Sequence, residues 1–335
     1  MQKIRIVNGT YKIRGKDVDL AGMVFPLVEG FKWGTKGSYI TVDAKDVNGF
    51  PDRNIKIMVP DEDSFEHVDE KTKVTQREET DEETIERMRE RFDMLEDMTK
   101  AAKKGTVRAM IVSGPPGVGK SFGVEKVLGK HDLIATLGEK APKYEVVKGA
   151  MSAIGLYCKL FNYADKDNVL VFDDCDSVLL DDLSLNILKA ALDSKKSRRI
   201  HWNTDSFKLR NEGVPDSFEF KGSAIFITNI KFDNVKSKKL RDHLEALESR
   251  CHYIDLTIDT EREKMLRIKQ ITGDGMLDEY MLGETVVDDI VDFIDINKKR
   301  LRELSLRTVL KVADLAKAFP DRWEAMAENT VMRRS

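Results

Sequence analysis

Apolar and polar residues alternate along the first 60 positions of the chain. The alternating runs at 4–6 and 11–13 flank Asn8-Gly9, which predicts two strands joined by a type I′ hairpin turn. Two more strands are expected at 39–42 and 55–59, each bounded by glycine-containing loops. These patterns predict a small β-rich domain at the N-terminus.

The spacing of the apolar residues then changes from every second residue to every third or fourth residue. Residues 61–98 contain sixteen acidic and six basic side chains, and the first half of this stretch has no apolar periodicity. From about Glu82 the apolar residues fall on one helical face. They are Ile85, Met88, Phe92, Leu95 and Met98. We expect the β-rich domain and an acidic linker over residues 1–75 and a linker helix over 76–105, ended by Gly105. The helix is interpreted as solvated and acidic, and a partner-binding acidic tail is the alternative.

Strand-like and helix-like patterns alternate beyond residue 106. Apolar β-type runs occur at 108–113, 144–147, 169–172, 224–228 and 252–256. Such alternation predicts a parallel sheet covered by helices on both faces, over residues 106–257. After about residue 258 the pattern is helical throughout, which predicts a separate α-helical domain over 258–335. The expected fold class is therefore α/β with a C-terminal helical domain and a small N-terminal β-rich domain.

A glycine-rich segment links the first of these strands to a helix. It reads Gly114-Pro115-Pro116-Gly117-Val118-Gly119-Lys120-Ser121 and fits the P-loop pattern G-x-x-x-x-G-K-[ST]. Glycines let the backbone N–H groups turn toward phosphate oxygens, and the helix that starts near Phe122 adds its N-terminal partial charge. Lys120 is expected to reach the β- and γ-phosphates of ATP, and Ser121 to bind Mg²⁺. A chance glycine-rich turn is the alternative, which the flanking strand and helix disfavour.

Two carboxylates end the apolar strand at 169–172. Ligands of a parallel sheet sit at the carboxyl ends of its strands, so Asp173 is expected to hold Mg²⁺ together with Ser121. Asp174 is expected to activate the attacking water. Taken alone this motif also fits a strand that ends in a solvated turn, but it lies about fifty residues after a P-loop.

With these motifs in order, residues 80–320 resemble the AAA+ ATPase superfamily, as a single module for which a phage-type member is one candidate. The strand ending in Asn229 resembles sensor 1, and the segment containing Arg250 resembles the arginine-finger segment, with the Ser-Arg-Cys triplet seen in clamp loaders. The helix containing Arg307 resembles sensor 2 of the α-helical lid. The resemblance implies catalytic roles for Asn229, Arg250 and Arg307. The family usually has Asp-Glu where this chain has Asp173-Asp174, a departure that bears on the rate of turnover and not on nucleotide binding.

The resemblance also implies an assembly and a class of activity. AAA+ proteins form ring homo-oligomers, most often hexamers, and hydrolyse ATP between subunits to load or remodel a macromolecule. A nucleic-acid transaction is slightly favoured over protein remodelling, with DNA or a replication or remodelling protein as partner. An ATP-regulated scaffold with little turnover is the second hypothesis, and a P-loop small-molecule kinase is the third.

Composition narrows these expectations. The 335 residues are 41% hydrophobic and 34% charged with a net charge of −3, which excludes a polycation that coats nucleic acid by bulk charge. No apolar run is long enough to span a membrane, and the N-terminus lacks the apolar core of a secretory signal. The three cysteines are scattered, which argues against a disulfide framework or a structural zinc site. We expect a cytoplasmic protein with no membrane partner.

Several segments are candidates for contact with the macromolecule. A basic cluster at 195–199 lies close to Trp202, and a second cluster comprises Lys231, Lys236, Lys238, Lys239 and Arg241. Either could bind nucleic-acid phosphates, or be ordinary solvated surface. Residues 148–157 could form a pore-facing loop, although the spacing of Leu156 and Leu160 favours the buried face of a helix. Residues 203–222 are interpreted as an insertion without an assigned role.

Overall fold

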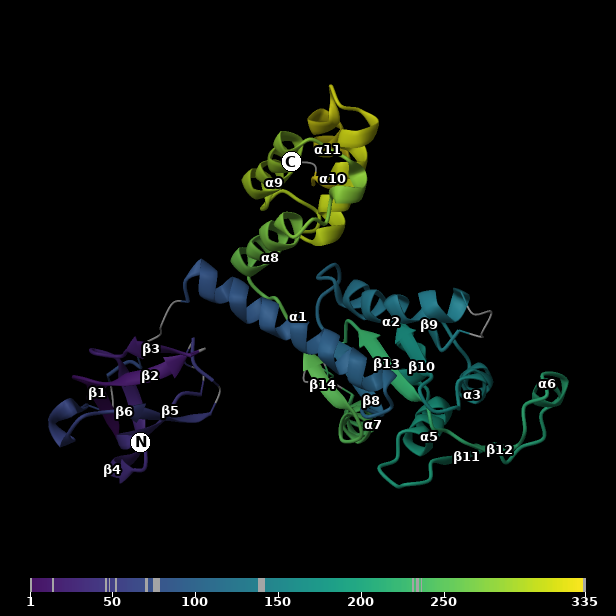
Figure 1. Ribbon diagram of the computed structural model, residues 1–335, viewed down its shortest axis with the longest axis horizontal. Coiled ribbons are helices and arrows are strands. Elements are labelled where there is room, and N and C mark those ends of the chain that lie inside the picture. Colours follow the sequence, from purple (N-terminus) through teal and green to yellow (C-terminus); the bar gives the residue numbers. More distant parts are fainter. Residues whose placement is uncertain are drawn as a thin grey trace. The chain divides into compact units, whose positions relative to one another are not determined.

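The chain divides into two compact units, Met1–Glu83 and Thr84–Ser335 (Figure 1). The computed structural model describes residues 2–333 other than 14, 46, 48, 52, 70–71, 75–78, 138–141, 231, 233–234 and 236.

The first unit is a seven-stranded antiparallel sheet with the order β3-β2-β6-β5-β4-β1-β7. Its strands are β1 (Lys3–Ile6), β2 (Thr10–Ile13), β3 (Lys16–Asp19), β4 (Val24–Gly34), β5 (Gly37–Asp43), β6 (Asn54–Met58) and β7 (Phe65–Val68), and a short 3₁₀ helix, η1 (Glu62–Ser64), precedes the last of them. Their alternate apolar residues form one core that includes Ile4, Ile6, Phe25, Ile40 and Ile57. The β-type runs predicted from the sequence are therefore confirmed as strands.

The predicted hairpin at Asn8-Gly9 is wrong. Strand β1 pairs with β4 and β7, while β2 pairs with β3 and β6, so the two strands around Asn8-Gly9 are not partners. Gly9 does not have the positive φ that a type I′ turn requires. A Cβ atom on Gly9 would lie 3.0 Å from side-chain carbons of both Ile57 and Ile6. The glycine is thus needed for close packing in the core, a requirement that has the same sequence signature as a turn.

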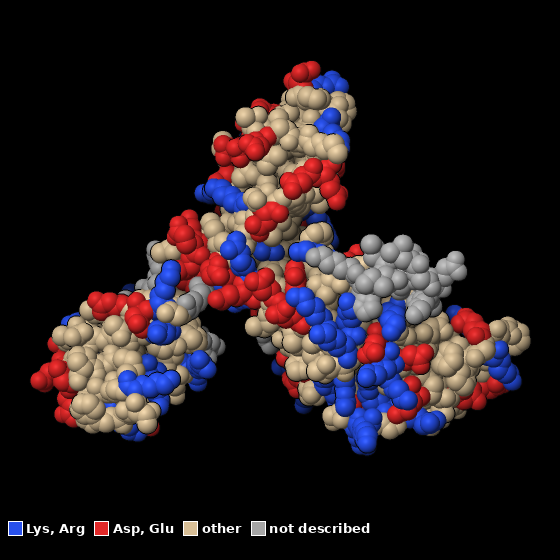
Figure 2. Space-filling model, in the orientation of Figure 1, with Lys and Arg blue, Asp and Glu red and all other residues tan. Residues whose placement is uncertain are grey.

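Helix α1 (Asp81–Lys103) crosses the boundary into the second unit, and it confirms the predicted helical face. Met88 and Leu95 are buried, and Gly105 follows the helix with φ of +67°. Acidic side chains line the exposed side of α1 (Figure 2), as expected for a solvated acidic helix.

A five-stranded parallel sheet follows, with the order β14-β8-β13-β10-β9. The strands are β8 (Ala109–Ser113), β9 (Tyr144–Lys148), β10 (Val169–Asp173), β13 (Ser223–Thr228) and β14 (His252–Asp255), at the positions predicted from the sequence. The intervening helices are α2 (Lys120–Leu137), α3 (Ala153–Asn162), α4 (Ser177–Leu180), α5 (Asp182–Ala191) and α7 (Lys238–Glu248). The P-loop segment at 114–121 directly follows β8, and helix α2 begins within it, as predicted from the sequence.

Both faces of the parallel sheet are buried. Met110 and Val112 of β8 pack with apolar residues of α1 and α2 on one face, whereas Ala109 and Ile111 pack with those of α3, α5 and α7 on the other. Burial on both faces explains why these strands are continuous apolar runs rather than alternating ones. The sheet is therefore a rigid support for the loops at its carboxyl edge.

Two segments with ambiguous sequence patterns have clear structures. Residues 153–162 form α3 with Leu156 and Leu160 fully buried, so the helical interpretation of 148–157 is confirmed. The predicted insertion at 203–222 contains the short helix α6 (Phe207–Asn211) and the strand β12 (Ser217–Glu219), which pairs antiparallel with β11 (Arg199–His201) just before the insertion.

The remainder of the chain is helical, as predicted. Helices α8 (Glu261–Gly273), α9 (Glu284–Asn297), α10 (Leu306–Ala318) and α11 (Trp323–Val331), with a short 3₁₀ helix η3 (Asp278–Tyr280), enclose their own apolar core. Helix α8 begins with a capping box, in which Thr260 and Glu263 satisfy each other's backbone N–H groups. We refer to these helices as the lid.

Candidate functional site

The carboxyl ends of β8, β10 and β13 bring the predicted motifs together. In the parallel register Ser113 is opposite Thr228, and Asp173 is opposite Ile227. The P-loop after β8, the carboxylates after β10 and Asn229 after β13 are therefore neighbours at one edge of the sheet. This convergence is what the spacing of the motifs predicts for a phosphate-binding site.

The P-loop backbone relies on its glycines. Gly117 and Gly119 have φ of +72° and +101°, in the left-handed region that other residues adopt at a cost. Gly114 has little room, because a Cβ atom there would lie 2.9 Å from the carbonyl oxygen of Leu256. Helix α2 starts at Lys120, directly after the loop, so its unpaired N–H groups and partial positive charge face the same edge.

Lys120 is the buried cation of the site. Its Nζ donates hydrogen bonds to the carbonyl oxygens of Gly114 and Pro115, at 2.6 and 2.9 Å, and to Oδ1 of Asn229 at 2.8 Å. Burial lowers the pKa of Lys120 to about 8; Asp174 and Asp173 oppose this effect, and the charge of Arg307 adds to it. A phosphate group would replace these carbonyl contacts with a charge-assisted interaction.

Ser121 and Asp173 form the pair expected to hold Mg²⁺. The Ser121 hydroxyl donates to Oδ1 of Asp173 at 2.9 Å, and Asp173 is 5% exposed. Mg²⁺ bound to nucleotides takes one or two protein oxygens, with phosphate and water oxygens as its other ligands, so this pair fits it. In the described ranges no group of three or more His, Cys, Asp or Glu could form a dedicated metal site.

Asn229 connects Lys120 to Asp174. Its Oδ1 accepts from Lys120, and its Nδ2 donates to Oδ1 of Asp174 at 2.8 Å. Asp174 has φ of +52° and its N–H donates to the carbonyl oxygen of Ile227 at 3.0 Å. Both Asp174 and Asn229 are exposed, so their polar groups are open to a ligand at this edge.

The lid closes over the P-loop from the other side. The Leu306 N–H, in the first turn of α10, donates to the carbonyl oxygen of Gly117 at 3.0 Å. Arg307 is the next residue and is exposed; its charge acts on Lys120, so it lies in the neighbourhood of the site, as the sensor-2 assignment expects. Phe122, on the first turn of α2, is 72% exposed.

Arg250 is not brought into this constellation. It follows α7, is exposed, and its guanidinium donates to the carbonyl oxygen of Ala246 and, at 3.4 Å, to the Ser249 hydroxyl. An arginine acting on the nucleotide of a neighbouring subunit has to be exposed, which Arg250 satisfies.

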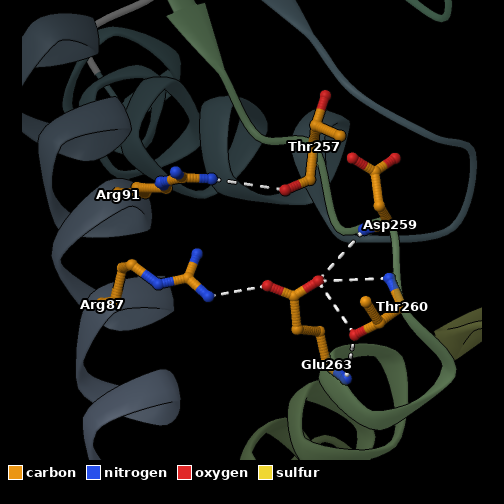
Figure 3. A network of polar contacts seen from close by, with 6 residues as sticks. All are labelled: Arg87, Arg91, Thr257, Asp259, Thr260 and Glu263. Atoms are coloured by element: carbon orange, nitrogen blue, oxygen red, sulfur yellow. Dashed lines mark hydrogen bonds and ion pairs between the residues drawn. The ribbon is translucent and has the colours of Figure 1, made fainter. Parts of the chain in front are cut away.

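A polar network attaches α1 to the hinge between sheet and lid (Figure 3). Arg87 pairs with Oε1 of Glu263 at 2.6 Å, and Arg91 donates to the carbonyl oxygen of Thr257 at 3.3 Å. The other carboxylate oxygen of Glu263 accepts from the N–H groups of Asp259 and Thr260, each at 3.2 Å. Burial opposes ionisation of Glu263, but the hydrogen bonds from Arg87 and Thr260 outweigh it and lower the pKa of this carboxyl.

The basic clusters differ from their sequence interpretation. Arg198 is buried and donates to the carbonyl oxygens of Ala191 and Gly222, so only Lys195, Lys196 and Arg199 of the first cluster are exposed. Trp202 packs against Tyr157, with ring centroids 5.5 Å apart, and its indole N–H is buried; it is not a free stacking surface.

The second cluster lies largely outside the described part of the chain. Lys231 and Lys236 are not described, nor is the side chain of Lys239. Lys238 and Arg241 are exposed, and the guanidinium of Arg241 donates to the carbonyl oxygen of Val235 at 2.8 Å.

Two contacts at the site were missed by the sequence reasoning. Lys148, the last residue of β9, lies 3.4 Å from Oδ2 of Asp173 and 3.0 Å from Oε1 of Glu125. The buried Thr228 hydroxyl donates to Oδ1 of Asp176 at 2.7 Å. Both residues sit where predicted parallel strands end, so the strand-end rule that pointed to Asp173 could have found them.

The chain has only weak similarity to solved structures. No model of a known protein family matches the chain. Similar solved structures include the replication initiator DnaA bound to AMPPCP and single-stranded DNA, with 13% identity, 70% of this chain and 63% of that chain covered, and a TM-score of 0.38. Domain III of the Thermotoga maritima replication initiation protein DnaA has 10% identity, 72% and 91% coverage and a TM-score of 0.40. The chain thus spans less than two thirds of the length of the DnaA protein bound to AMPPCP. Similarities of this size say nothing about function.

None of the described helices is long and apolar enough to cross a membrane.

Sequence comparison gives a closer relationship. An uncharacterized 36.7 kDa protein in the nrdC-mobD intergenic region of Enterobacteria phage T4 is 36% identical over 258 residues. The match covers 76% of this chain and 78% of the phage protein. The chain therefore belongs to the same protein family as this phage T4 protein.

Proposed function

We propose that the protein is an AAA+ ATPase that binds ATP with Mg²⁺ at the P-loop and hydrolyses it in an assembly of identical subunits. The observation that carries the proposal is a pair of contact sets at the sheet edge, Lys120–Asn229–Asp174 and Ser121–Asp173, whose members are neighbours along the chain at 120–121 and 173–174. A bare P-loop would support nucleotide binding alone. The additional carboxylate and amide beside it support hydrolysis.

Each residue has a role that follows from its position. The P-loop N–H groups and Lys120 bind the phosphates, and Ser121 and Asp173 hold Mg²⁺, which would neutralise phosphate charge. Asp174 accepts the proton of the attacking water, and Asn229 orients both Asp174 and the water through its amide. The hydrogen bond already present between Asn229 and Asp174 supports this division of roles.

Completion of the site by a neighbouring subunit is part of the proposal. Arg250 is exposed and is not among the residues that contact the phosphate site of its own chain. In a ring, of six subunits as the commonest case, it would stabilise transition-state charge on the adjacent nucleotide. Arg307 would act from the lid of the same subunit.

The macromolecule acted on is proposed to be nucleic acid, ahead of a protein substrate. Basic side chains gather over the P-loop module on the face drawn in Figure 2, whereas the acidic residues concentrate along α1. Lys195, Lys196 and Arg199 are exposed members of the predicted basic clusters. Phosphate contacts by such residues give binding that weakens with salt.

A scaffold with little turnover is the second candidate function. Asp174 is one methylene shorter than the glutamate usual in the family, and its carboxylate is engaged by Asn229. Under this alternative, ATP would favour assembly through its higher affinity for the assembled state.

Steady-state phosphate release with MgATP, measured over a range of protein concentrations, tests the proposal. Specific activity is expected to rise with concentration as subunits assemble, and to increase further with single-stranded or duplex DNA rather than with an unfolded protein. Tight ATP binding without phosphate release would favour the scaffold. Stimulation by unfolded protein alone would make the substrate a protein.

A further inference from the structure

A cavity of about 350 Å³ lies between the P-loop and the lid. Residues 115–118 of the P-loop line one side, and residues from α8 and from the 298–306 segment line the other. Its lining is rich in cationic side chains: Lys264, Arg267, Lys298, Lys299, Arg302 and Arg333. Of these, Arg267 is the one that is buried.

Arg267 is buried at 6% exposure and extends from α8 toward the P-loop. Its guanidinium carbon lies 3.5 Å from the ring centroid of Phe92, and one terminal nitrogen donates to Oε1 of Gln270 at 2.9 Å. The other terminal nitrogen lies 3.9 Å from where a Cβ atom on Gly119 would be. The lid thus places a cation directly against the phosphate-binding loop.

Arg267 has no direct ion-pair partner among the described residues, and the carboxylates that act on its charge, those of Asp274 and Asp93, do so from a longer distance. Within the described part of the chain no carboxylate lies within ion-pair distance of it, and its buried Nε has no hydrogen-bond partner. Burial lowers the pKa of Arg267 to about 10, so it remains charged at neutral pH. A buried charge without a partner is unfavourable, which points to an anion supplied from outside the chain.

Arg198 shows what a structural arginine looks like in this protein. It is equally buried and also faces an aromatic ring, that of Phe220. Its guanidinium, however, donates to two carbonyl oxygens, those of Ala191 at 3.1 Å and Gly222 at 3.0 Å. Among the described residues, Arg267 has no backbone carbonyl partners of this kind, and it lines a cavity. Satisfying backbone carbonyl groups therefore does not account for the burial of Arg267.

Two other unpartnered atoms line the same cavity. The Ser305 hydroxyl and Oε1 of Glu303 are buried without hydrogen-bond partners. A carboxylate oxygen cannot accept from a phosphate but can accept from a hydroxyl group. The cavity therefore fits a ligand that carries both an anionic group, near Arg267, and a hydroxyl donor, and a nucleotide has both.

We propose that Arg267 is a second cationic ligand of the nucleotide, binding its phosphate portion from the lid in addition to Lys120 in the P-loop. The inference rests on the proposed function, because it takes the P-loop ligand to be a nucleoside polyphosphate. It adds a residue of the first lid helix to the site and gives Phe92 of α1 the task of holding the guanidinium in place through its ring face.

Isothermal titration calorimetry on the full-length protein tests this assignment, with MgATP and inorganic tripolyphosphate as probes. Arg267→Gln is expected to weaken both probes by about tenfold to a hundredfold, the range for loss of a charge-assisted hydrogen bond. The melting temperature of the ligand-free variant is expected to stay equal to or above that of the wild type, because a desolvated buried charge has been removed. Arg267→Lys is expected to recover part of the affinity.

Arg198→Gln is the matched control. It removes a satisfied buried arginine, so its ligand-free melting temperature is expected to fall while the affinity of the folded protein for ATP stays within about twofold of wild type.

Three results would overturn the assignment of Arg267. They are unchanged ATP affinity in Arg267→Gln, loss of ATP affinity with tripolyphosphate affinity unchanged, and failure of both Arg267 variants to fold. A wild-type protein that binds neither probe would instead refute nucleotide binding itself.

Discussion

Asp174 follows a buried strand with φ of +52° and is held there by Asn229. Substitution by Asn keeps the acceptor oxygen for that hydrogen bond but removes the group that takes a proton. We therefore expect Asp174→Asn to bind ATP within about threefold of wild type and to lose turnover by about 10² or more, the usual worth of a general base. Equilibrium binding and steady-state phosphate release on the same preparation measure the two quantities. Retention of wild-type turnover would remove Asp174 from the mechanism.

Lys120 gives the site a dependence on pH. The pKa of Lys120 in the free protein is about 8. A bound phosphate would favour the protonated form of Lys120. Above this pH, ATP binding is therefore coupled to the uptake of a proton by Lys120. ATP affinity is expected to be flat below about pH 7 and to fall as the pH rises through 8, by up to about tenfold per pH unit above that. Lys120→Arg is the control, because an arginine stays charged through this range and should flatten the profile whatever its overall affinity. An unchanged slope in that variant would assign the pH dependence to another group.

At the scale of elements, the polar network between α1 and α8 is expected to make a measurable contribution to the free energy of unfolding. Glu263 has a lowered pKa, so it contributes stability above about pH 4.5 that is lost as the pH falls. Glu263→Gln is expected to reduce the free energy of unfolding at pH 7 by about 1–3 kcal/mol, and the difference from wild type should shrink in acid. Denaturant titrations at pH 7 and pH 4 measure both effects.

The exposed pair Arg89–Glu86 on the same helix provides the control. Its side chains are about half exposed and its nitrogen and oxygen lie 3.5 Å apart, so Glu86→Gln should change stability by less than about 0.5 kcal/mol. Equal effects of the two substitutions would show that the α1–α8 network contributes no more than an ordinary surface pair.

The helices and strands of the second unit could be predicted because each hydrophobic pattern in this part of the sequence corresponds to one type of element. Buried parallel strands are continuous apolar runs, and the faces of α1 and of the lid helices repeat every three or four residues. The strand pairing of the first unit is harder to predict. Asn8-Gly9 has the sequence signature of a hairpin turn, but glycine is required at position 9 because a Cβ atom there would crowd the side chains of Ile57 and Ile6. Strand positions are local properties, but strand pairing depends on contacts between residues far apart in the sequence.

The same division holds for the site. The P-loop, Asp173 and Asp174 could be predicted because each lies at a fixed place relative to a strand end, and Asn229 could be predicted from the resemblance of its strand to sensor 1. Arg267 and Phe92 come from α8 and α1 and meet at Gly119 through packing alone, which no spacing in the sequence records. Arg198 and Trp202 were misjudged for the same reason, because basic or aromatic character does not reveal burial.

For the whole molecule, the central claim is that one subunit completes the active site of the next. The most direct measurement is phosphate release by an equal mixture of Arg250→Ala and Asp174→Asn proteins. Each variant alone is expected to be inactive, one lacking the arginine and the other the base. In random rings about a quarter of the interfaces would join an intact base to an intact arginine, and activity should return to about that fraction of wild type. A mixture no more active than its two components would contradict the account.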